Sequence, residues 1–117
     1  MHPIAILTGA SSGIGAAAAE QFVAAQFTVI NLSRRACPVA GVQTLTTDLS
    51  NAESLNESCK ALSEIVAEQS ASSVCLVHNA SLMLKDRCDT TGDDAMLQAL
   101  SVNVLGINTL NRALLPL

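Results

Sequence analysis

The chain has 117 residues, half of them hydrophobic, and only 14% of them are charged. This length allows one domain with a core of moderate size, and the formal net charge of -4 argues against a nucleic acid as an electrostatic partner. No apolar run reaches the roughly 18 residues of a membrane span, and the N-terminus lacks the basic region of a signal peptide.

The first half of the chain alternates between strand and helix patterns. Residues 4–7 form a short apolar run that is typical of a buried strand, and apolar residues then recur at helical spacing from Ile14 to about Gln26. Residues 27–32 and 42–46 are rich in β-branched side chains, which predicts a second and a third strand.

The second half continues this alternation. Ser50 and Glu53 have the spacing of a capping box, which predicts the start of a second helix. The unbroken apolar run at 74–77 predicts a fourth strand that is buried on both faces. A loop over 82–91 and a last helix from about Thr91 to Leu115 follow. The apolar stripe of that helix, which Asn103 interrupts, consists of Met96, Leu100, Ile107, Leu110 and Leu114.

The resulting order, β-α-β-β-α-β-α, is typical of an α/β fold in which helices cover both faces of a parallel sheet. Right-handed crossovers place the second strand beside the first and the third beside the second. We therefore predict a Rossmann-like, doubly wound, three-layer fold with strand order 3-2-1-4. Ligands bind such sheets at the switch point, at the carboxyl ends of the strands, so Gly9, Arg34, Asp48 and Asn79 should share one rim.

Three glycines lie between the first strand and the first helix, in the sequence Thr-Gly-Ala-Ser-Ser-Gly-Ile-Gly at residues 8–15, called the glycine turn below. Free backbone N–H groups and the positive end of a helix dipole at such a turn favour a phosphate or pyrophosphate. No Lys-Ser/Thr pair follows the glycines, which excludes a Walker-type loop, and their spacing is not G-x-G-x-x-G.

The glycine turn resembles the cofactor fingerprint of the short-chain dehydrogenase/reductase family. Three further motifs occur in that family's order: Asp48-Leu49 after the third strand, residues 78–81 (His-Asn-Ala-Ser) after the fourth, and residues 103–106 (Asn-Val-Leu-Gly) in the last helix. The resemblance covers nearly the whole chain. His78 and Ser81 depart from the family's Asn-Asn-Ala-Gly, and we assign His78 no catalytic role but a polar contact between strands.

The resemblance implies a role for each motif. Asp48 and Leu49 would contact the adenine. The alternative for Asp48 is that it is simply the N-terminal neighbour of the helix capped at Ser50. Asn79 would contact the adenine ribose or support the glycine turn, or could be an ordinary turn residue. Asn103 would belong to the catalytic set and organise a water and proton relay, or could be satisfied by a nearby backbone group. Apart from those at the end of the second strand, the residues predicted to bind the cofactor are Thr8, Gly9, Ser11, Ser12, Gly13, Ile14, Gly15, Asp48, Leu49, Asn79, Ala80 and Ser81.

The end of the second strand selects the cofactor. An acidic residue there would bond the ribose 2′-OH of NAD, but the sequence is Leu-Ser-Arg-Arg at 32–35. Arginine is suited to a 2′-phosphate. We therefore predict NADP(H), with the 2′-phosphate held by Ser33 and Arg34 and with Arg35 secondary. The alternative is that both arginines are solvated surface residues.

In the family a tyrosine is the general acid/base, a lysine lowers its pKa and a serine orients the substrate oxygen. This chain contains no tyrosine. We expect residues 1–117 to be the NADP(H)-binding domain of an oxidoreductase, truncated before the catalytic Ser and Tyr-x-x-x-Lys and inactive alone. That enzyme would transfer hydride between nicotinamide and a small-molecule carbonyl or alcohol. The alternatives are a naturally short, non-catalytic dinucleotide-binding or interaction module and, more distantly, a methyltransferase.

The remaining expectations concern surroundings and partners. The four cysteines form no C-x-x-C pair, which favours reduced structural thiols in a cytoplasmic protein over metal or redox chemistry. We expect no nucleic-acid or membrane partner and no metal. The family's last helix often lies at a dimer interface, so the resemblance implies a homo-oligomer formed through this helix.

Overall fold

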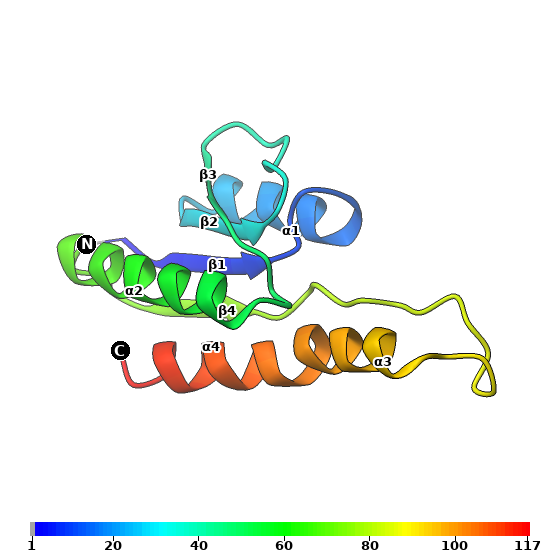
Figure 1. Cartoon of the computed structure of the whole chain (residues 1–117). Coiled ribbons are helices and arrows are strands. Elements are labelled where there is room, and N and C mark those ends of the chain that lie inside the picture. The colour runs from blue at the N-terminus through cyan, green and yellow to red at the C-terminus, as the bar shows by residue number, and fades with distance from the viewer. Residues whose placement is uncertain (1) are drawn as a thin grey trace.

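The computed structural model describes residues 2–117 as a four-stranded parallel sheet with helices on both faces (Figure 1). The strand order is β3-β2-β1-β4, which confirms the predicted order. The strands are β1 (Ile4–Thr8), β2 (Thr28–Ser33), β3 (Val42–Thr46) and β4 (Val74–Val77). The helices are α1 (Gly13–Ala24), α2 (Ala52–Glu68), α3 (Asp93–Leu100), the π-helical segment η1 (Ser101–Leu105) and α4 (Gly106–Leu114).

The register of the strands brings their carboxyl ends to one edge of the sheet. Leu7 in β1 lies opposite Asn31 in β2 and Val77 in β4. Asn31 in turn lies opposite Thr44 in β3. The segments that leave all four strands therefore meet around the end of β1, where the glycine turn begins.

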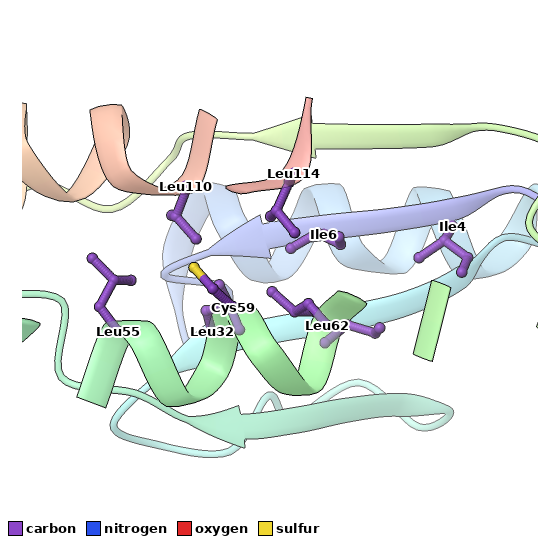
Figure 2. Packing of buried hydrophobic residues seen from close by; sticks show 9 residues of the cluster. Ile4, Ile6, Leu32, Leu55, Cys59, Leu62, Leu110 and Leu114 are labelled. Carbon is purple, nitrogen blue, oxygen red and sulfur yellow. The ribbon is translucent and has the colours of Figure 1, made fainter. Parts of the chain in front are cut away.

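Two hydrophobic clusters hold the layers together. On one face, residues of α2 and α4 pack against β1 and β2, and Figure 2 shows Leu62 and Leu110 among the side chains that point into this cluster. Burying a leucine side chain of this kind contributes about 1.5–3 kcal/mol. On the other face, α1 packs its small residues, such as Ala19, against Ala5 and Leu7 of β1. β1 is consequently buried along its whole length.

Two local predictions differ from the structure. The N-cap of α2 is Asn51, whose Oδ1 accepts a hydrogen bond from the Ser54 N–H at 2.9 Å. Ser50 does not cap the helix, because its hydroxyl is hydrogen-bonded to Asp48. The prediction that β4 is buried on both faces is also wrong: Cys75 is exposed, because it faces the side of α1, whose main sheet contacts are with β1 and β2.

The last helix begins at Asp93 and runs as one rod through η1 into α4, with its first part reaching beyond the sheet (Figure 1). Leu110 and Leu114 are buried as predicted, but Met96 and Leu100 are 46% and 45% exposed. These two lie in α3, whose main contacts are with η1 and not with the sheet. The apolar stripe is therefore covered only in its second half.

The four cysteines differ in exposure: Cys59 is buried, Cys37 is partly buried, and Cys75 and Cys88 are exposed. All four cysteines are free, and burial raises the pKa of the Cys59 thiol. Within residues 2–117 no group of three or more His, Cys, Asp or Glu side chains is placed to hold a metal ion. In the same part of the chain, no helix combines the length and the apolar character that crossing a bilayer requires.

Candidate functional site

A cavity of about 490 Å³ opens at the carboxyl ends of the strands. Gly9, Arg34, Asp48 and Asn79 all line it, so the four residues predicted to share a rim do share it. The other predicted residues that line it are Ser11, Ser12, Ser33, Arg35, Leu49, Ala80 and Ser81, and those that do not are Thr8, Gly13, Ile14, Gly15 and Asn103. The last helix contributes the lining residues Gln98 and Val102, which the sequence analysis did not single out.

The glycine turn places backbone unusually close to backbone. Gly9 has φ +71°, and a Cβ there would lie 3.0 Å from the Ala80 Cα. A Cβ on Gly15 would lie 2.4 Å from the Gly9 carbonyl oxygen. These approaches exclude larger residues and leave the rim open to a ligand.

The N-terminus of α1 lies at this rim, because its N-cap residue lines the cavity. Its N-cap residue, Ser12, has extended backbone, and its side chain caps no N–H group. The first turn carries no acidic residue. The first N–H groups of a helix have no partner within the helix, so this end of α1 can bind an anion such as a pyrophosphate.

Asn79 fastens the β4 side of the glycine turn. Its side-chain Nδ2 donates to the carbonyl oxygens of Thr8 (3.2 Å) and Gly9 (3.1 Å). The Thr8 hydroxyl accepts hydrogen bonds from the N–H groups of Asn79 (3.1 Å) and Ala80 (3.0 Å). Both donors of the Asn79 amide are thus used on the turn, which favours the supporting role among the predicted alternatives.

Asn31, which was not predicted as a site residue, holds the opposite side of the glycine turn. This side chain is fully buried in β2, and its Oδ1 accepts a hydrogen bond from the Ala10 N–H at 2.9 Å. Its Nδ2 donates to the Ser33 hydroxyl at 2.9 Å and to the Arg35 carbonyl at 3.2 Å. The available signal was a polar amide in the middle of an apolar strand, which requires partners when it is buried.

Residues 33–35, called the arginine turn below, border the cavity after β2. Arg34 and Arg35 are exposed, and neither forms an ion pair within residues 2–117. The Ser33 hydroxyl is occupied, because it accepts from Asn31 and donates to the Arg35 carbonyl oxygen. Two guanidinium groups that form no ion pair in that part of the chain therefore stand at the rim, where an anionic group of a ligand can reach them. Arg34 interacts with the Asp48 carboxylate beyond ion-pair distance.

Asp48 is fixed at the rim after β3. Its Oδ1 accepts hydrogen bonds from the Ser50 hydroxyl at 2.6 Å and from the Ser50 N–H at 3.0 Å. These two bonds hold the pKa of the carboxyl below its ordinary value; Arg34 adds to this effect, and desolvation opposes it. Asp48 therefore stays ionised at neutral pH, with a fixed orientation.

Asn103 lies in η1 and is satisfied by backbone. Its Oδ1 accepts from the Leu82 N–H at 2.7 Å, and its Nδ2 donates to the Leu82 carbonyl at 2.9 Å. Leu82 lines the cavity, whereas Asn103 does not. π-helical segments occur frequently at functional sites, and here the segment carries the amide that ties the last helix to the loop after β4.

His78 makes its contact with a helix and not with a strand, contrary to prediction. Its Nε2 lies 2.7 Å from Oδ1 of Asn111 in α4. Its Nδ1 is buried and has no partner among residues 2–117. The side chain thus joins the end of β4 to α4 and does not line the cavity.

The sequence and the fold of this chain are similar to those of known proteins. The family model described as short chain dehydrogenase matches residues 3–117. A crystal structure of an oxidoreductase of the short chain dehydrogenase/reductase family from Brucella ovis, in complex with a partially ordered NAD, is similar with a TM-score of 0.88 and 25% identity. The similarity covers 99% of this chain and 57% of that one.

Two further solved structures have the same fold. One is a short-chain dehydrogenase/reductase from Burkholderia vietnamiensis, with a TM-score of 0.88, 26% identity and coverage of 98% of this chain and 56% of that one. The other is the ligand-free aldohexose dehydrogenase of Thermoplasma acidophilum, with a TM-score of 0.82, 28% identity and coverage of 98% and 44%. This chain thus spans little more than half the length of the first of these structures. No curated protein matches it significantly.

Proposed function

Because the chain belongs to the short-chain dehydrogenase family, whose model matches residues 3–117, we propose that it forms the NADP(H)-binding domain of an oxidoreductase. The enzyme would move a hydride between the nicotinamide and a small-molecule carbonyl or alcohol carbon. The observation that carries the cofactor choice is the arginine turn, which lines the cavity with two guanidinium groups that form no ion pair within residues 2–117 and which has no acidic residue of its own.

The residues around the cavity fit such a cofactor. The glycine turn and the N-terminus of α1 would hold the pyrophosphate, because they offer close backbone approach and free N–H groups. Arg34 would bind the 2′-phosphate, with Arg35 secondary and with Ser33 contributing its hydroxyl by turning from the Arg35 carbonyl. Asp48 and Leu49 would border the adenine, and residues 79–81 would form the wall next to the turn.

NAD is the second candidate cofactor, because the similar Brucella ovis structure is in complex with NAD. The two candidates differ only by the 2′-phosphate, so the charge of the arginine turn decides between them. In NAD-binding relatives of this architecture an acidic residue bonds the ribose hydroxyls at the corresponding place. The arginine turn has none.

Hydride transfer also requires a group that donates or accepts a proton at the substrate oxygen. The family's tyrosine cannot come from this chain, which has no tyrosine. We propose that residues 1–117 bind the cofactor and that the Ser and Tyr-x-x-x-Lys segment would be supplied by further polypeptide. Asn103 would act within that catalytic set. The alternative function is a non-catalytic dinucleotide-binding module, which the same cavity would serve without a proton donor.

Titration of the 117-residue chain with NADPH and with NADH, followed by fluorescence of the reduced nicotinamide, tests the cofactor. NADPH should bind at least about tenfold more tightly, as expected for one charge-assisted contact. Arg34→Ala should remove this preference and leave NADH binding unchanged. Arg112→Ala, which removes an exposed arginine from α4, is the matched control. Equal affinity for both nucleotides would refute the NADP(H) assignment.

The apolar surface of the last helix supports a proposal about assembly. Leu97, Val104 and Leu105 are between 55% and 61% exposed on α3 and η1. Exposed apolar patches of this kind mark interaction sites, and we propose that the helix pairs with a second copy of the chain.

We further propose a cytoplasmic location, which the four free cysteines support.

A further inference from the structure

Asn31 joins the two turns that border the cavity. Its Oδ1 accepts from the Ala10 N–H in the glycine turn. Its Nδ2 donates to the Ser33 hydroxyl and the Arg35 carbonyl in the arginine turn, and to the Thr44 hydroxyl at 3.2 Å. A single side chain thus bridges residues that are more than 20 positions apart in the sequence.

The position of Asn31 is unusual for a core residue. It is fully buried and shares the α1-facing side of the sheet with Val29 and Leu7. An amide in such a place costs free energy unless its polar atoms are bonded, and here both of its polar atoms have partners. Because the side chain is held in one orientation, its oxygen and its nitrogen fix the two turns relative to each other.

Asn31 does not itself line the cavity. We propose that it is a positioning residue that makes recognition of the 2′-phosphate by the arginine turn depend on the glycine turn. Its amide holds the Ser33 hydroxyl and the Arg35 backbone carbonyl, and these two anchors on either side of Arg34 set the direction in which Arg34 leaves the strand. This inference rests on the proposed NADP(H) function.

Asn79 provides the matched comparison. It is also an asparagine that bonds the glycine turn, but from β4, and its side chain bonds only Thr8 and Gly9. Loss of the Asn79 amide should weaken NADPH and NADH binding by the same factor, because both cofactors carry the pyrophosphate. Loss of the Asn31 amide should weaken NADPH binding further, because only NADPH carries the 2′-phosphate.

The experiment measures the dissociation constants of NADPH and NADH for the wild-type chain, Asn31→Ala and Asn79→Ala, with circular dichroism as a check of folding. In Asn31→Ala the preference for NADPH over NADH should fall about tenfold, as expected for one or two lost hydrogen bonds. In Asn79→Ala the preference should stay within about twofold of wild type, while both affinities fall. An unchanged preference in a folded Asn31→Ala would overturn the proposal.

Thr44→Val decides the matter if Asn31→Ala does not fold. This substitution conserves shape and removes a hydroxyl that accepts from Asn31 and from the Cys37 N–H at 3.2 Å. It leaves the bond between Asn31 and Ala10 in place. Of the two bonds lost, only the one from Asn31 bears on the coupling, so NADPH affinity should fall about threefold, as for one neutral hydrogen bond, without a change for NADH. An equal loss for both nucleotides would contradict the coupling. If the wild-type chain itself shows no preference for NADPH over NADH, the NADP(H) assignment fails, and the inference about Asn31 fails with it.

Discussion

The glycine turn and the last helix both border the cavity, and they differ in how much of their surface this chain covers. All five residues of β1 are buried, and amides from β2 and β4 clasp the turn that follows. In α3, by contrast, Ala99 is the only buried residue, and Leu97 is 61% exposed.

The two regions are held in place by different kinds of contact. The geometry of the glycine turn is fixed by contacts between segments that are distant in the sequence. Substitutions of exposed side chains should therefore leave the turn intact, whereas substitutions that force its backbone atoms apart should disrupt it. The position of α3 depends mainly on η1 and α4, which continue it, and on the side-chain amide of Asn103, which forms two hydrogen bonds with the Leu82 backbone. The two regions should therefore respond differently to the same kind of substitution.

Gly15→Ala should have the largest effect. The new Cβ would lie 2.4 Å from the Gly9 carbonyl oxygen and 2.5 Å from Asn79 Nδ2, so backbone must shift. We expect a loss of about 3 kcal/mol in the free energy of unfolding, measured by urea denaturation, together with loss of dinucleotide binding.

The same substitution in the less covered region is the control. A Cβ on Gly92, the N-cap residue of α3, would meet no atom within 4 Å. Gly92→Ala should cost less than about 1 kcal/mol, the scale of an N-cap preference. If both variants lost the same stability, the contrast between the two regions would be wrong.

Asn103→Ala tests the one strong link of the second region. Both hydrogen bonds to the Leu82 backbone would be lost, which should cost about 2 kcal/mol. The Leu82 N–H should also exchange with deuterium faster, because its acceptor is gone, while exchange in β1 should change little. Asn108→Ala, which removes an exposed asparagine from the same helix, serves as the control. Equal exchange at Leu82 in both variants would contradict the role of this amide.

Leu97→Gln combined with Val104→Gln should change the stability of the single chain by less than about 0.5 kcal/mol per site, because both side chains are exposed. The change should instead appear in self-association. Sedimentation of the wild-type chain should show a concentration-dependent dimer, and the double variant should shift toward monomer. A wild-type chain that stays monomeric at high concentration would refute pairing through this helix.

The same contrast explains what the sequence could predict. The strand order and the shared rim follow from apolar periodicity, which a single sequence displays, and from the general rule that crossovers between parallel strands are right-handed. Asn79 was identified because it follows a strand at the switch point. Asn31 was not, because its partners, Ala10 and Thr44, are distant in the sequence and no spacing rule connects them.

Local rules also failed where two side chains compete for one role. Ser50 has the spacing of a capping residue, yet Asn51 caps α2, because the Ser50 hydroxyl bonds the Asp48 carboxylate. In the last helix the apolar stripe extends to Met96, but Met96 is not buried. Periodicity shows which face of a helix is apolar; it does not show whether another element covers that face.

Asp48→Asn should have the smallest effect, and one that depends on pH. The pKa of Asp48 is lowered in the folded chain from 3.8, so its ionised form stabilises the fold above that value. This contribution is lost as the pH falls through the lower folded value. The stability difference between wild type and Asp48→Asn should therefore be present at pH 7, begin to shrink near pH 3.8 and disappear below the lowered pKa of the folded chain. Ser50→Ala should reduce the difference at pH 7, because the Ser50 hydroxyl is the largest cause of the lowered pKa. A difference that persisted unchanged in strong acid would show that Asp48 acts through packing and not through its charge.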